Sequence, residues 1–189
     1  MKRRWFLVSV VLLPLLTNSK AKADGVTVRW DIIQFTSRNP PTFTAGGTAS
    51  ALAEDGSMIT LTGSGTFTPG EDGEVTGGGT WVTQAPHGAN TGSGTYHVTG
   101  LIKFDVAPGS VPSPPFVDLI GPAVKAHPGL AFLRIRYSDG SRGVLVVSCT
   151  FVGTPPTVFE GITASKDFID YFMRVPGYFT LFHFISNED

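Results

Sequence analysis

The chain of 189 residues has very little cysteine, and this scarcity limits the chemistry open to it. Cys149 is the only cysteine, so an internal disulfide is excluded. It lies in the apolar stretch 144–151, where we expect a buried thiol, because a reactive thiol needs exposure and a nearby cation. The four histidines show no paired spacing, and we therefore expect neither a metal site nor a cofactor; they are His87, His97, His127 and His183.

Two common catalytic motifs are also missing. The sequence has no Gly-x-Ser-x-Gly elbow, which positions the nucleophile of many serine hydrolases. None of its Gly-x-Gly pairs continues as Gly-x-Gly-x-x-Gly at the start of a helix, as a dinucleotide-binding turn requires. A serine hydrolase and a dinucleotide-dependent enzyme are both disfavoured.

The first 23 residues have the order of a cleavable signal peptide. Lys2, Arg3 and Arg4 precede the apolar run 5–16, and small residues lead to an expected cleavage between Ala23 and Asp24. About 12 apolar residues are too few to span a bilayer as a helix. We therefore expect export to the periplasm or the extracellular space without a stable membrane anchor. The arginine pair resembles the twin-arginine signal, but the preceding lysine and the strongly apolar run favour the general secretory route.

An excess of basic residues is absent from the expected mature chain. Residues 24–189 hold nine basic and fifteen acidic residues, a formal charge of −6. Such a chain lacks the positive potential that attracts phosphate backbones, so nucleic acid is not an expected partner. The length fits one domain with a sizeable core.

One phrase, Gly-x-Gly-Thr-aromatic, is present three times, at 63–67, 77–81 and 92–96, and each copy ends in an aromatic residue. The starts are 14 and 15 residues apart, which suits one strand plus its turn. Asp-Gly pairs at 55–56, 72–73 and 139–140 are typical hairpin turns. They predict eight or nine strands, near 26–35, 43–53, 58–67, 74–84, 93–106, 130–138, 142–151, 157–163 and 178–185. A short helix is expected at 165–173, where Phe168 and Phe172 are spaced i, i+4.

Alternation assigns the faces of these strands. In 93–106 one face carries Tyr96, Val98, Ile102, Phe104 and Val106, which we interpret as the core face. The repeated glycines fall on the same inward face as the aromatic residues, which suggests a sharply coiled sheet or glycines covered by aromatic rings. The predicted fold is an all-β, single antiparallel barrel of about eight strands spanning 24–189. A two-sheet sandwich is the alternative.

Candidate site residues follow from this barrel. Its interior would present the ligand-binding residues Phe67, Trp81, Tyr96 and Tyr137. Glu160 lies among apolar residues and, if inward with His183 or a tyrosine, would be a general acid or base. The alternative places Glu160 outward, beside a buried Phe159.

Two further features have two interpretations each. Arg134 and Arg136 point from the same strand face, either as solvated side chains or as a clamp for a carboxylate or phosphate. The segment 107–129 contains six prolines, too many for a central strand, and is either a lid or a crossover that closes one end.

The Gly-Thr-aromatic strands, Phe159-Glu-Gly161 and the aromatic strand 178–185 resemble the allene oxide cyclase and dirigent barrels. The resemblance implies a calycin-like or allene oxide cyclase-like barrel with an apolar cavity for a hydrophobic ligand, whose cyclisation or coupling it would shape. Lipocalin-like transport is disfavoured, because residues 25–30 lack the Gly-x-Trp spacing. No catalytic residue of the family matches a position here.

The leading functional hypothesis is an exported, non-enzymatic protein that binds a small apolar molecule or a partner surface. The first alternative is a cyclase-like or isomerase-like enzyme acting on a hydrophobic substrate, with Glu160 and a buried tyrosine or histidine moving protons. The second is a structural secreted protein without a ligand.

Overall fold

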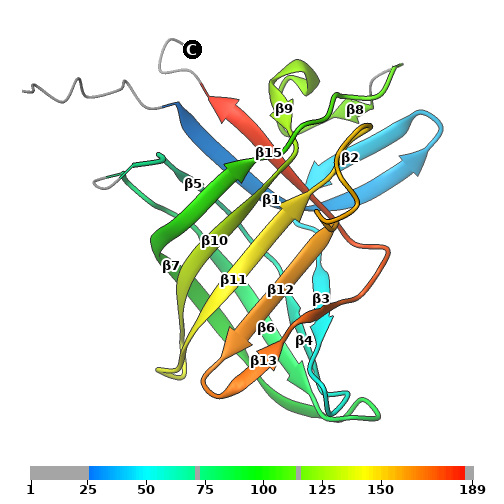
Figure 1. The fold of residues 1–189 in the computed structure, drawn as a ribbon. Coiled ribbons are helices and arrows are strands. Elements are labelled where there is room, and N and C mark those ends of the chain that lie inside the picture. Colours follow the sequence, from blue (N-terminus) through cyan, green and yellow to red (C-terminus); the bar gives the residue numbers. More distant parts are fainter. Residues whose placement is uncertain (1–25, 71–72, 114–115, 186–189) are drawn as a thin grey trace, which may run out of the picture.

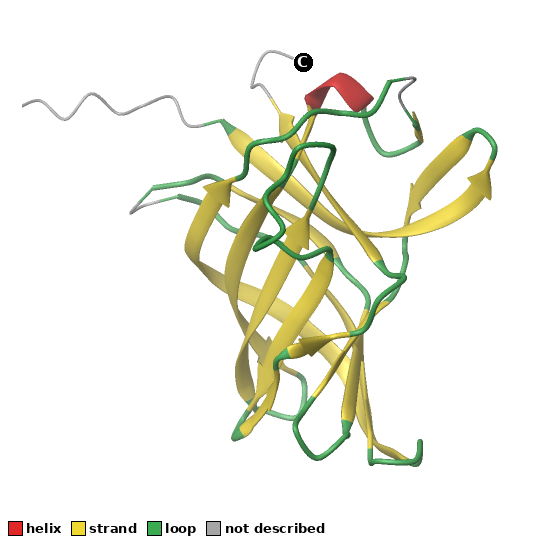
Figure 2. Ribbon diagram, turned by 45° about the vertical axis from the view of Figure 1, so that its right-hand side comes forward, coloured by secondary structure: helices red, strands yellow, loops and turns green. Residues whose placement is uncertain are grey.

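The computed structural model describes residues 26–70, 73–113 and 116–185, so the expected signal peptide and its cleavage site lie outside the described residues. Strands account for most of this part (Figure 1). They are β1 (Thr27–Arg38), β2 (Pro41–Ala45), β3 (Ala49–Leu52), β4 (Met58–Leu61), β5 (Ser64–Phe67), β6 (Gly78–Gln84), β7 (Asn90–Val106), β8 (Val117–Asp118), β9 (Ala126–His127), β10 (Gly129–Tyr137), β11 (Arg142–Cys149), β12 (Gly161–Lys166), β13 (Ile169–Tyr171), β14 (Met173–Arg174) and β15 (Phe179–Ile185). Within the described residues, the one helical turn is the 3-10 element η1 (Ala123–Lys125), red in Figure 2.

The all-β prediction is confirmed, but the predicted closed barrel is not supported. The hydrogen-bonded path runs β13-β12-β11-β10-β7-β6-β5-β1-β15-β9, and within the described residues no ladder joins its two ends. β3, β4 and β14 form a branch beside β6, and β2 forms a hairpin with the second half of β1. Figure 1 shows this sheet coiled strongly on itself, with the β1–β2 hairpin projecting from it.

Side chains bridge part of the gap in the ladder, between β15 and the end of β11. The Thr180 hydroxyl of β15 donates a hydrogen bond to the Ser148 carbonyl of β11 at 2.6 Å. The Ser148 hydroxyl in turn donates to the Phe159 carbonyl, just before β12. Both side chains are fully buried. Polar contacts therefore hold the coiled sheet together where backbone pairing stops.

The turns behave as their chemistry predicts. Asp55 accepts hydrogen bonds from the Ser57 backbone N–H and hydroxyl, and Asp139 does the same with Ser141. The glycine after each aspartate has a positive φ, 82° at Gly56 and 91° at Gly140, which glycine adopts without strain. The third expected turn, at 69–73, includes residues outside the described part.

The prediction of a helix at 165–173 is wrong. β12 continues to Lys166, a turn at Asp167 and Phe168 follows, and the chain returns as β13 along β12. Asp167 has φ 52°, and the Phe168 side chain is fully exposed instead of facing a core. A nine-residue helix is marginal on its own, whereas the open edge of β12 offers a ladder of backbone hydrogen bonds.

The repeated glycines lie where aromatic rings or neighbouring backbone pass closely. A Cβ atom at Gly92 would lie 3.0 Å from the Trp81 ring, and one at Gly63 would meet the Tyr96 hydroxyl at 2.2 Å. A Cβ atom at Gly77 would meet the Ser64 carbonyl at 2.4 Å. Rings from neighbouring strands thus cover several of these glycines, as aromatic rescue of glycine in a curved sheet requires.

The face assignment of β7 holds in part. Tyr96 and Val98 are buried and Phe104 packs against the core, but Ile102 and Val106 are exposed. The pairing between β7 and β10 shifts register twice, and each extra residue reverses the alternation that follows it.

The proline-rich connection between β7 and β10, residues 107–128, is called the strap below. β8 pairs in parallel with β2, and β9 pairs with β15 at Phe182 and His183, near the middle of that strand. Figures 1 and 2 show β8, β9 and η1 beside β2 and the end of β15. The strap therefore begins and ends beside the β7–β10 pair, where the Ala107 N–H donates to the Pro128 carbonyl, and in between it reaches β2 and β15.

Candidate functional site

An apolar pocket of about 400 Å³ lies between the strap and the β1–β15 pair. Pro112 and Phe116 of the strap line one side, and Ile33 of β1 with Leu181 of β15 line the other. The segment that follows β11 adds further apolar side chains, Phe151 among them. The volume lies within the usual range of small-molecule sites, roughly 300–1,000 Å³.

Aromatic rings form a continuous chain around this pocket. The Phe43 ring contacts the Phe116 ring with centroids 4.8 Å apart, and Phe116 contacts Phe151 at 5.8 Å. Phe43 also lies 6.2 Å from Phe179, the first residue of β15. Rings from the hairpin, the strap and the sheet thus meet at one place. Such offset and edge contacts add stability beyond the burial of apolar area.

Glu160 provides the acidic group of the pocket. It precedes β12, and its carboxylate accepts hydrogen bonds from the backbone N–H of Thr150 at 2.7 Å and of Thr180 at 2.8 Å. The Thr150 hydroxyl also donates to it at 3.0 Å, whereas the Thr180 hydroxyl, which donates to the Ser148 carbonyl, lies 3.3 Å from it. Burial raises the pKa of Glu160 to about 7, and these hydrogen bonds limit the rise. The carboxyl group therefore changes charge near neutral pH.

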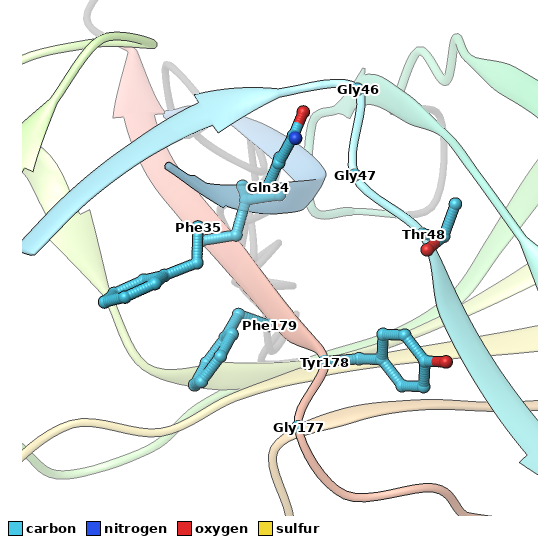
Figure 3. A pocket seen from close by; sticks show the side chains of 9 residues that line it. Gln34, Phe35, Gly46, Gly47, Thr48, Gly177, Tyr178 and Phe179 are labelled. Atoms are coloured by element: carbon cyan, nitrogen blue, oxygen red, sulfur yellow. The ribbon is translucent and has the colours of Figure 1, made fainter. Parts of the chain in front are cut away.

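A second pocket, of about 340 Å³, adjoins the first and shares Ile33 and Phe179 with it. Figure 3 shows the Phe35 and Phe179 rings on one side of it and Tyr178 pointing to the other side, toward Thr48. Gly46 and Gly47 form the wall between β2 and β3, where no side chain fills the space. This pocket is more polar than the first.

A buried polar network lies under the strap. His183 Nε2 of β15 is 2.7 Å from a carboxylate oxygen of Asp118, and both side chains are at most 4% exposed. Burial on its own would raise the pKa of Asp118, but hydrogen bonds from His183 and two backbone N–H groups bring it below the usual value. On the neighbouring strand Arg29 pairs with the buried Asp31 through two hydrogen bonds, of 2.8 and 2.9 Å. The Asp118–His183 contact ties the strap to the sheet.

The two predicted catalytic residues do not share a hydrogen bond. Glu160 is bound by threonines in the apolar pocket, whereas His183 pairs with Asp118 under the strap. The tyrosine hydroxyls are also committed, Tyr96 to the Thr62 carbonyl and Tyr137 to the Ser165 carbonyl, each at 2.8 Å. Of the predicted catalytic residues, Glu160 lines the apolar pocket.

The four predicted ligand-binding residues are packed in the interior of the coiled sheet. Phe67, Trp81, Tyr96 and Tyr137 are each at most 4% exposed. The Trp81 and Tyr137 rings meet edge to face at 5.7 Å, and Phe67 packs instead against Phe104. The two pockets described above are lined by other residues. These four rings are therefore part of the packed core inside the coiled sheet.

Comparison with known proteins finds no relative from which a function could be inferred. No family model, curated protein or solved structure matches this chain. The resemblance to allene oxide cyclase and dirigent barrels therefore rests on the sequence phrases alone.

Sequence reasoning missed the aromatic lining of the apolar pocket. Phe43, Phe116 and Phe151 come from three segments far apart in the chain, and each follows or precedes proline-rich or glycine-rich stretches that look like loops. The strap's prolines gave the one usable signal, because a long connection in a small domain often covers a site. Within the described residues no cluster of His, Cys, Asp or Glu could hold a metal ion, and no helix is long and apolar enough to cross a membrane.

Proposed function

We propose that this protein is an exported binder of a small apolar molecule, which occupies the pocket between the strap and the β1–β15 pair. The observation that carries the proposal is the pocket itself, about 400 Å³ lined mainly by aromatic and aliphatic side chains, with Glu160 as its polar end. Burial of apolar ligand surface there would supply about 25 cal/mol per Å² before the cost of association is subtracted. Export follows from the N-terminal segment.

The pocket differs from the interior cavity that the sequence suggested. A ligand inside the coiled sheet would have to displace the packed rings of Trp81, Tyr96 and Tyr137. A ligand under the strap needs no such displacement, because the space is present between Phe43, Phe116 and Phe151. The proposed site therefore lies on the outer face of the β1–β15 pair.

A neutral fluorescent probe tests the proposal without involving surface charge. We expect N-phenyl-1-naphthylamine to bind saturably and to be displaced by long-chain alcohols. Val152 lines the pocket and is 65% exposed, so Val152→Trp should block the entrance and weaken binding about tenfold or more. Val124→Trp is the matched control, because Val124 is 85% exposed on η1 and does not line the pocket.

Three results would overturn this function. The first is a probe that does not saturate. The second is equal binding by both tryptophan variants. The third is native mass spectrometry that finds the protein from its source reproducibly empty, together with no thermal shift across a panel of lipids and aromatic compounds. That last result would favour the structural alternative.

An isomerase or cyclase is the second candidate, and Glu160 is the observation that favours it. A carboxyl group with a pKa of about 7 beside an apolar pocket has the properties of a general acid or base. Glu160→Gln would then abolish turnover of a hydrophobic substrate while leaving the protein folded and the pocket able to bind the neutral probe. Unchanged turnover in that variant would exclude this role for Glu160.

A further inference from the structure

Three arginines converge on the outer face of the sheet, away from the strap. Arg134 and Arg136 lie two residues apart on β10, so their side chains leave the same face. Arg142 of β11 pairs directly across from Arg136. All three line one groove of about 520 Å³ over β7, β10, β11 and β12.

No anionic partner neutralises these arginines within the described part of the chain. Among those residues, no ion pair or hydrogen bond involves a guanidinium group of Arg134, Arg136 or Arg142. Three other cations are paired: Arg29 with Asp31, Lys103 with Asp105 and Lys166 with Asp139. Like charges placed directly across a ladder, as in Arg136 and Arg142, destabilise a sheet unless something neutralises them.

The groove also has a shape that follows from the register of β7. Its two register shifts against β10 lie next to the arginines, at Phe132/Leu133 and Arg134/Ile135. Gly100 pairs with Arg134 and has no side chain to fill the space, and a Cβ atom there would lie 3.6 Å from an Arg134 guanidinium nitrogen. The shifts turn Ile102 outward, where it lines the groove beside the cations.

We infer that this groove binds a small organic anion through its phosphate, sulfate or carboxylate group. Planar guanidinium groups donate pairs of hydrogen bonds to the oxygens of such groups. Side chains two apart on one strand and directly across on the next lie about 5–7 Å apart at their bases, within reach of one oxyanion. Ile102 and Val144 provide apolar contact for the rest of the molecule. Asp167 is the one carboxylate in the lining, so the groove keeps a positive balance.

The site is independent of the pocket under the strap. It uses β10 and β11, whereas the apolar pocket uses β1, β15 and the strap. The groove would recognise the charge of a ligand, whereas the pocket would recognise its apolar surface. An experiment that disproves one of the two proposed sites therefore does not disprove the other.

Titration of the folded protein with three anions tests the inference. Inorganic phosphate, phenyl phosphate and benzoate are added at about 20 mM ionic strength, where screening is weak, and binding is followed by backbone NMR shifts and calorimetry. We expect saturable shifts in β10 and β11, with Arg136→Gln or Arg142→Gln each weakening affinity about tenfold. Tighter binding of phenyl phosphate than of inorganic phosphate would support contact with Ile102 and Val144.

Arg38→Gln is the matched control, since Arg38 is an exposed arginine at the far end of β1. It removes the same charge from the protein but does not line the groove. The substituted arginines are exposed, so the variants should keep the wild-type unfolding temperature, which is measured alongside. The inference is overturned if none of the anions saturates, or if Arg38→Gln weakens binding as much as the groove variants do.

Discussion

Glu160 shows how one side chain can connect segments that the backbone leaves unpaired. Its carboxylate reaches the end of β11 through Thr150 and the start of β15 through Thr180. The sequence identified Glu160 as unusual from its apolar neighbours but left its facing open, because alternation is ambiguous next to a turn. Its partners could not be predicted, since they are 10 and 20 residues away and are brought close by the coiling of the sheet.

The raised pKa of Glu160 predicts a specific pH dependence of stability. Between the unfolded value, near 4.5, and the folded value, about 7, the unfolded chain ionises this group while the folded protein keeps it neutral. The folded state therefore loses stability as pH rises through this window, by about 3 kcal/mol for this group alone. Urea unfolding at pH 4 to 8 should show this loss in the wild type and not in Glu160→Gln. Parallel curves for the two proteins would contradict the prediction.

The segment after β12 shows where local sequence pattern and long-range pairing disagree. Phe168 and Phe172 have helical spacing, and the sequence alone favoured a helix there. The structure instead buries Tyr171 on β13 and leaves Phe168 exposed in the turn. Most strands elsewhere were predictable because Asp-Gly turns and alternation agree with each other, although 43–53 and 58–67 each break into two strands and 157–163 is strand only from Gly161. Here the deciding factor was the free edge of β12, which no local window reveals.

Two substitutions in this segment distinguish the observed hairpin from the helix that the sequence predicted. Phe168→Ser should change the free energy of unfolding by no more than about 0.5 kcal/mol, because the ring is fully exposed. Tyr171→Ser should cost about 3 kcal/mol or more, because that side chain is 2% exposed. Chemical denaturation followed by fluorescence measures both. A large loss from Phe168→Ser would instead indicate that the ring packs into a core.

The sequence correctly predicted that the chain folds into β-strands, but it did not predict that the sheet stays open. Alternation, turn residues and inward glycines indicated a coiled antiparallel sheet, and that much is confirmed apart from the short parallel pair of β2 and β8. Closure depends on whether the first and last strands meet in register, which sequence patterns do not encode. The candidate site had the same limit, because its lining comes from β1, β2, β15, the strap and the segment after β11, which only the coiled sheet brings together.

The polar bridge across the gap should contribute measurably to global stability. Thr180→Val keeps the shape of the side chain but leaves the Ser148 carbonyl without its 2.6 Å hydrogen bond. We expect a loss of about 1–3 kcal/mol, the cost of an unsatisfied buried group. Thr80→Val is the control, since Thr80 is exposed and its contact with Thr62 lies on the surface. Equal midpoints for Thr180→Val and wild type in a urea titration would show that the bridge is dispensable.

An open sheet normally carries a risk of association, because an unpaired strand can template the addition of another chain. Here the strands at the two ends of the ladder path are very short, three residues in β13 and two in β9. Each offers few free backbone groups to an incoming strand. The protein can therefore leave its ladder unclosed and still resist the edge-to-edge aggregation that longer, flatter edges invite.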